Sequence, residues 1–201
     1  MKNYLEILYN PISFRKIKIL FRLPKIIVFL LLTFFFVNNL KAQKSLVSDT
    51  LAWQISATKR ASELEAFFNL RKWDSYVRYN HPKLIQMMGG VKKMTETVTQ
   101  QMQTIENEMT IDSFDFGKPK GFVKCDSMVN CLLSQTLVLT SKKDLKSVRV
   151  TNFLLGVSED KGSTWYFIDP DIGSELLDKI VPNKCKNLKI PRRISEIKNK
   201  N

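Results

Sequence analysis

The chain has few of the residue types that build metal centres and nucleotide sites. Its 201 residues include one histidine, three cysteines and seven glycines. A single histidine without a Cys-x-x-Cys pair does not supply the ligands of a zinc site. The sequence also lacks a phosphate-binding loop, a dinucleotide-binding glycine motif and a G-x-S-x-G nucleophile motif. We therefore expect the protein to bind no metal and no other cofactor.

Long apolar runs are also scarce. The most prominent, Ile26–Val37, has 12 residues without a charge, whereas a membrane-spanning helix needs about 20 apolar residues. Basic residues precede this run, and the small residue Ala42 follows it at a suitable distance for signal peptidase. We expect residues 1–42 to be a signal peptide that is cleaved after Ala42, so that the protein is exported to the periplasm or the extracellular medium. The alternative is an uncleaved N-terminal anchor.

Positive charge is abundant, but it is confined to the two ends of the chain. The net charge is +13, yet residues 43–182 together carry only +1. A nucleic-acid-binding domain needs cations on its folded surface, one for each phosphate contact. We therefore expect no nucleic-acid partner. The basic segment 183–201 is predicted to be a flexible tail, with weak association with an anionic envelope surface as a candidate role.

All three cysteines lie in the predicted mature chain. In an oxidising compartment, Cys125 and Cys131 are candidates for a disulfide across a hairpin. The alternative is that both remain half-buried thiols. Cys185 lies in the basic tail and is left without a predicted partner.

Helical periodicity dominates the first half of the mature chain. Ser56 is a candidate N-cap for the first helix, and Pro82 starts a short helix that Gly89 ends. The last helix has the clearest amphipathic pattern, with one apolar side suited to packing on a sheet. The expected helical ranges are 57–70, 73–79, 83–88 and 91–108.

Strand-like alternation begins after Met109. An apolar parity slip in the fourth strand predicts a bulge near Thr151-Asn152. Because helices come first and strands second, the sequence predicts an α+β fold with an antiparallel sheet. The expected strands are 110–116, 121–125, 131–140, 147–158 and 164–169, and a helical turn is expected over 174–180.

One local motif resembles the Asp-box hairpin of sialidase propellers. Residues 158–165 fit S-x-D-x-G-x-T-W. Asp160 is expected to accept hydrogen bonds from turn amides, Gly162 to adopt positive φ, and Trp165 to pack beneath the turn. A propeller needs several blades of roughly 40–50 residues. A single motif in a chain of this length is therefore interpreted as a β-hairpin rather than a sugar-binding site.

The order of elements over 57–169 resembles the nuclear transport factor 2-like superfamily, which has a cone-shaped α+β fold. The resemblance implies N-terminal helices packed on a curved antiparallel sheet, and we expect a single domain, 43–182, between the predicted signal peptide and the basic tail. Related proteins include isomerases and dehydratases that place Asp, His and Tyr inside the cone. The residues that carry the resemblance are Phe67-Phe68, Trp73-Asp74 and Tyr79-Asn80-His81-Pro82.

The leader ending in Lys41-Ala42-Gln43, together with Met87-Met88-Gly89-Gly90, also resembles a group of exported proteins of Bacteroidetes-type bacteria.

Aromatic residues with polar groups are candidates to line a ligand cavity, although ordinary core packing is the alternative. His81 precedes Pro82, which suits either a helix cap or a general base at a pocket mouth. No catalytic set can be assigned by spacing, and Asp74 and Asp169 are the acids considered as partners of His81. The predicted ligand-binding residues are Tyr76, Tyr79, His81 and Trp165.

These observations favour a non-catalytic module that binds a small apolar or aromatic ligand or interacts with another protein. The alternative is a small lyase-like or isomerase-like enzyme that uses His81 with a Tyr or an Asp. Convergence of Tyr76, Tyr79, His81 and an acid in one cavity would favour the enzyme.

Overall fold

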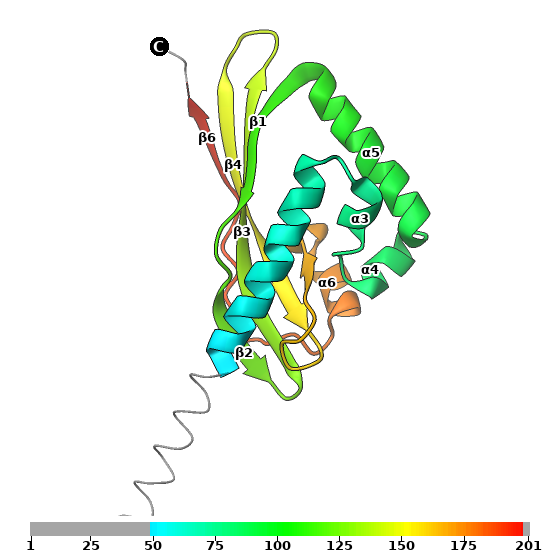
Figure 1. Ribbon diagram of the computed structural model, residues 1–201, viewed down its shortest axis with the longest axis vertical. Coiled ribbons are helices and arrows are strands. Elements are labelled where there is room, and N and C mark those ends of the chain that lie inside the picture. The colour runs from blue at the N-terminus through cyan, green and yellow to red at the C-terminus, as the bar shows by residue number, and fades with distance from the viewer. Residues whose placement is uncertain (1–48, 199–201) are drawn as a thin grey trace, which may run out of the picture. The chain divides into compact units, whose positions relative to one another are not determined.

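The computed structural model describes residues 49–198. The predicted signal peptide and its cleavage site lie outside these residues. Within them the helices precede most of the strands, so the predicted α+β class is confirmed (Figure 1). None of the helices in residues 49–198 is long and apolar enough to span a membrane.

The helical half begins earlier than expected. A helix covers residues 49–69 and is followed by α3 (Trp73–Val77), α4 (Pro82–Met87) and α5 (Gly90–Glu108). Ser56 therefore lies inside the first helix, and its prediction as an N-cap is wrong. The apolar stripe of this helix extends back to Trp53, which is buried and fixes the earlier turns against the rest of the protein.

Within the described residues, six antiparallel strands form one open sheet. The central pair is β3–β4; β1 and β2 both pair with β3, whereas β5 and β6 both pair with β4. The strands are β1 (Met109–Phe116), β2 (Lys120–Cys125), β3 (Met128–Ser141), β4 (Ser147–Ser158), β5 (Tyr166–Ile168) and β6 (Ile194–Lys198).

The predicted bulge in β4 is wrong. The register with β3 is continuous from Ser147, opposite Thr140, to Ser158, opposite Val129. The apolar parity changes for another reason: the second half of β4 is buried on both faces. Leu154 packs in the core cluster of helix 49–69, whereas Leu155 packs in the cluster of α6 (Ser174–Ile180). A strand covered on both sides carries apolar residues at consecutive positions.

Three apolar clusters hold the layers together. Ala57, Ala61 and Leu64 of helix 49–69 pack on one face of β3. On the opposite face, Leu177 and Ile180 of α6 pack with residues of β4 and β5. A third cluster joins Phe68, Met102 of α5 and Phe114 of β1, with the rings of Phe68 and Phe114 stacked.

The C-terminal segment differs from the predicted flexible tail over its described part. Cys185 is buried and disulfide-bonded, and β6 pairs with β4 from Ser147 to Thr151. Some of the basic charge of this segment is also engaged, since Lys184 pairs with Asp178. The strand is stabilised by its partner rather than by its own sequence.

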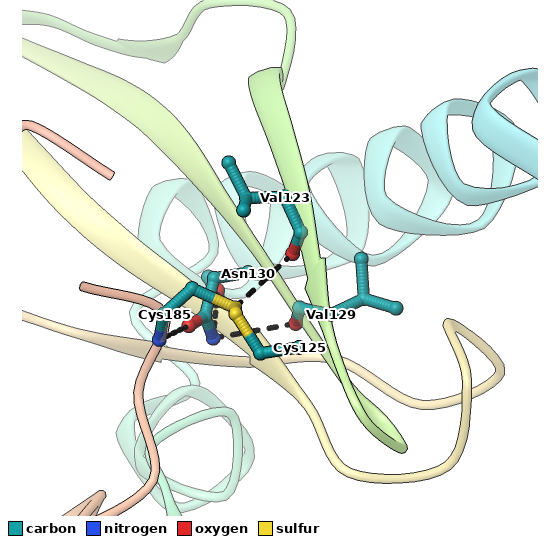
Figure 2. The surroundings of a disulfide bond; sticks show 6 residues. Val123, Cys125, Val129, Asn130 and Cys185 are labelled. Atoms are coloured by element: carbon teal, nitrogen blue, oxygen red, sulfur yellow. Dashed lines mark hydrogen bonds between the residues drawn. A yellow bond between two sulfur atoms is a disulfide. The ribbon is translucent and has the colours of Figure 1, made fainter. Parts of the chain in front are cut away.

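The disulfide joins Cys125 to Cys185, so the predicted Cys125–Cys131 pair is corrected (Figure 2). Cys125 lies opposite Met128, and Met128 and Cys131 are three residues apart on one strand, so their side chains point to opposite faces. Cys131 is a free thiol within the core, and burial raises its pKa to about 12. The amide of Cys185 donates to Oδ1 of the buried Asn130 over 2.7 Å.

Candidate functional site

A cavity of about 490 Å³ lies between α5 and the sheet. Its apolar wall comes from the core cluster around Phe68 and Phe114, from α5, and from Leu137 and Val150 on the central strands. Its polar end is lined by Gln135, Asn152, Asp169 and Arg193, and the amide of Gln101 on α5 also lines the cavity.

A second, smaller cavity of about 110 Å³ adjoins the first. The two cavities share Tyr76, Gln135 and Asp169 in their linings. The smaller one is called the inner cavity below, and the larger one the outer cavity. The inner cavity is also lined by Tyr79 and Phe167. Together they make a compartment with an apolar outer part and a more polar inner part.

The strand register explains how the polar end arises. Gln135 and Asn152 are direct partners across β3 and β4. The pairs on either side, Leu133 with Leu154 and Leu137 with Val150, point to the same face, because residues two apart on a strand share a face. Two amides therefore replace two apolar side chains in the middle of an otherwise apolar stripe.

Tyr76 lies where the two cavities meet. Burial raises the pKa of its hydroxyl to about 12, a hydrogen bond with the Gln135 side chain lowers it, and the negative charge of Asp169 raises it. The net result is a phenol that keeps its proton at any physiological pH. It therefore serves as a neutral hydrogen-bonding group.

Tyr79 connects the inner cavity to helix 49–69. Its hydroxyl donates to Oε2 of Glu63 over 2.8 Å, and the guanidinium of Arg60 lies 3.5 Å from its ring centroid. Burial and the bond to Glu63 raise its pKa to about 12, although the charge of Arg60 lowers it. Like Tyr76, Tyr79 remains protonated.

Asp169 and Arg193 close the polar end of the outer cavity. Asp169 follows β5, and its Oδ1 accepts a hydrogen bond of 2.9 Å from the amide of Asp171. Arg193 donates from Nε to Oδ1 of Asn152 over 2.6 Å. Its Nη2 lies 3.1 Å from Oδ2 of Asp171 and 3.8 Å from Oδ2 of Asp169. The C-terminal segment thus supplies one wall of the cavity.

His81 lines neither cavity. It caps α4, since its Nδ1 accepts a hydrogen bond of 3.3 Å from the amide of Lys83, as the capping interpretation predicted. It is only 4% exposed. Its Nε2 lies 3.5 Å from Oε1 of Glu159, and its ring makes an edge contact with Tyr166. Tyr76 and Tyr79 are therefore the predicted site residues that share a cavity.

Trp165 belongs to the Asp-box hairpin, which has the predicted geometry. Oδ1 of Asp160 accepts from the amides of Ser163 and Thr164 at 3.1 and 2.8 Å, and Gly162 has φ of 92°. Trp165 is 1% exposed, and its Nε1 donates to Oγ of Ser56 over 2.9 Å. Trp165 lines a surface groove of about 420 Å³ together with Lys59 and Arg60, and it lines neither of the two cavities.

No family model, curated protein or solved structure matches this chain. The resemblance to the nuclear transport factor 2-like superfamily therefore stays a prediction.

Gln135, Asn152 and Arg193 of the polar end, and Gln101 of α5, were not among the predicted site residues. Gln135 and Asn152 had a detectable signal, because each is an amide inside a strand that is otherwise apolar on that face. Arg193 had none. It lies in a basic segment of low hydrophobicity, and only the pairing of β6 with β4 brings it to the cavity.

Proposed function

We propose that this protein is a non-catalytic module that binds one small amphipathic molecule between α5 and the sheet. The proposal rests on one observation: the apolar outer cavity and the more polar inner cavity adjoin each other and share Tyr76, Gln135 and Asp169 in their linings. Ligand sites in proteins are typically apolar hollows with a few polar groups that fix the orientation of the ligand. The two-part compartment has this composition.

Binding is favoured over catalysis by the state of the groups in the compartment. A general base works best when its pKa is near the operating pH. Tyr76 and Tyr79 both have pKa values of about 12, so neither accepts a proton near neutrality. His81, the candidate base of the lyase-like or isomerase-like alternative, caps α4 instead of lining the cavities.

We further propose that the sheet and helices form the cone of the nuclear transport factor 2-like superfamily, and that the chain is exported. The Cys125–Cys185 disulfide supports export, since such bonds persist in oxidising compartments and are rare in the cytosol of most organisms.

Fluorescence titration with N-phenyl-1-naphthylamine, an apolar dye that brightens in apolar sites, tests the proposal. We expect saturable binding to the wild type and at least tenfold weaker binding to Leu137→Trp, because the larger ring fills the outer cavity. Val138→Trp is the matched control, since Val138 points to the opposite face of the same strand. Saturable binding that is equal in all three proteins, or no saturable binding to the wild type, would overturn it.

A further inference from the structure

The inner cavity contains one formal charge. Asp169 is the one acidic residue among those that line it, and the lining contains no Lys, Arg or His. A ligand group that enters this space is therefore close to an acidic side chain and to no basic one in the lining. A carboxylate head group would be repelled there, whereas a cation would be attracted.

Arg193 offsets this charge only in part. It lines only the outer cavity, and it divides its hydrogen bonds and ion pairs among Asn152, Asp169 and Asp171. Its closest approach to Asp169 is 3.8 Å, longer than its 3.1 Å contact with Asp171. The two aspartates together carry one more charge than the arginine between them.

Aromatic rings make up much of the remaining wall. Tyr76, Tyr79 and Phe167 all line the inner cavity. Aromatic rings attract cations through their quadrupoles, and groups of such rings are used to recognise organic ammonium ions. Tyr79 already takes part in one such contact, with Arg60 at 3.5 Å from its ring centroid.

We propose that the inner cavity binds the ammonium head group of an amphipathic amine, whose apolar body occupies the outer cavity. Asp169 supplies the counter-charge and the aromatic rings enclose the head group, while Gln135 supplies an amide acceptor. This inference rests on the proposed binding function and adds the chemical class of the ligand. A volume of about 110 Å³ suits a small head group rather than a bulky one.

Three probes with the same ten-carbon body separate the charge classes: decylammonium, decanol and decanoate. Isothermal titration calorimetry of the disulfide-bonded wild-type protein at pH 7 is expected to give decylammonium at least tenfold tighter binding than decanoate, with decanol between them. Binding of decanoate that equals or exceeds that of decylammonium would overturn the inference and leave the binding function intact. Failure of all three probes to bind would overturn the binding function itself.

Two variants assign the preference to Asp169. Asp169→Asn keeps an oxygen for the amide of Asp171 and is expected to lose at least tenfold in affinity for decylammonium, with unchanged affinity for decanol. The unchanged decanol affinity shows that the cavity is intact. Asp126→Asn is the matched control, since Asp126 lies in the exposed β2–β3 turn and asparagine tolerates its positive φ of 54°. Equal losses in both variants would contradict the assignment.

Arg193→Gln has the opposite expected effect. The substitution removes the cation that competes for Asp169, so decylammonium is expected to bind a few-fold more tightly than to the wild type, and decanol about equally. Weaker binding of decylammonium with unchanged decanol binding would show that Asp169 is not the counter-charge.

Discussion

The indole Nε1 of Trp53 donates a hydrogen bond of 2.9 Å to the carbonyl oxygen of Lys161, 108 residues further along the chain. One helical turn later, the hydroxyl of Ser56 donates to the carbonyl oxygen of Gly162 over 2.7 Å. The Asp-box hairpin is therefore fastened to helix 49–69 through its backbone. In this protein the motif holds helix 49–69 against the sheet through these hydrogen bonds.

Gly162→Ala is expected to destabilise the protein by about 2–4 kcal/mol. A Cβ at this position would lie 2.1 Å from Cδ1 of Trp53, and φ is 92°. Gly173→Ala is the control: φ is 100° there, but nothing lies within 4 Å of the added Cβ. It should cost only the backbone strain, about 1–2 kcal/mol. Chemical denaturation measures both, and equal losses would contradict the close packing of Trp53 on Gly162.

Asp160→Asn is expected to reduce the dependence of stability on pH. Burial raises the pKa of Asp160, but hydrogen bonds from Thr164, Ser158 and Ser163 outweigh it and hold the pKa below its ordinary value of 3.8. A carboxyl whose pKa is lowered by folding stabilises the protein above that ordinary value. The contribution is lost as the pH falls through the lowered pKa.

Thermal melting of wild type and variant between about pH 6 and pH 3 tests this expectation. The wild type should have the higher Tm at pH 6, and the gap should narrow on acidification. A gap that is constant or widens would show that Asp160 does not stabilise the hairpin through its charge.

Reduction of the Cys125–Cys185 disulfide is expected to lower the free energy of unfolding by about 4 kcal/mol, because the bond closes a loop with a sequence separation of 60. Urea denaturation with and without a phosphine reductant measures the loss. Cys185→Ser should remove the sensitivity to reductant. Cys131→Ala should retain it, since Cys131 is a free thiol. Retention of the sensitivity by Cys185→Ser would contradict the pairing.

His81→Ala is expected to be less stable than His81→Asn by about 1 kcal/mol, because asparagine can still accept the Lys83 amide hydrogen bond at the start of α4. Both variants lose the ring contact with Tyr166, so the difference isolates the cap. Denaturation midpoints measure it. Both variants should bind the naphthylamine dye as the wild type does, and a selective loss of dye binding would instead place His81 at the ligand site.

Local periodicity was enough to predict several elements. The strand Ser147–Ser158 and the helix Ser174–Ile180 have the bounds expected from the sequence, and α5 begins one residue before the expected start. The Asp-box geometry was also predictable, because it depends on contacts within eight consecutive residues. In each case the determining interactions lie close together along the chain.

The missed features depend on contacts that are distant in sequence. Nothing in the segment 194–198 alone favours a strand, which forms because β4 offers an open edge there. The partner of Cys125 could not be predicted before the faces of β2 and β3 were known. Ser56 was mistaken for a helix cap because two of its hydrogen-bond partners, Gly162 and Trp165, are more than 100 residues away; the third is the carbonyl oxygen of Trp53.

The lining of the two cavities was predictable in part. Tyr76 and Tyr79 were selected for their amphipathic rings, and both line the inner cavity. His81 and Trp165 were selected for similar reasons, but local backbone contacts occupy them. Gln135, Asn152 and Arg193 complete the polar end only after the register of β3, β4 and β6 is set.

The position of Arg193 near the end of the chain matters for any trimmed version of the protein. Removal of the residues after Pro182 would take away Cys185, Arg193 and β6 together, while the central strands and the helices kept their hydrogen bonds. The outer cavity would lose the wall that Arg193 supplies and would open to solvent on that side. The edge of β4 that β6 covers would be unpaired, and such an edge can pair with strands of other chains. Affinities measured on such a fragment would describe a different binding site.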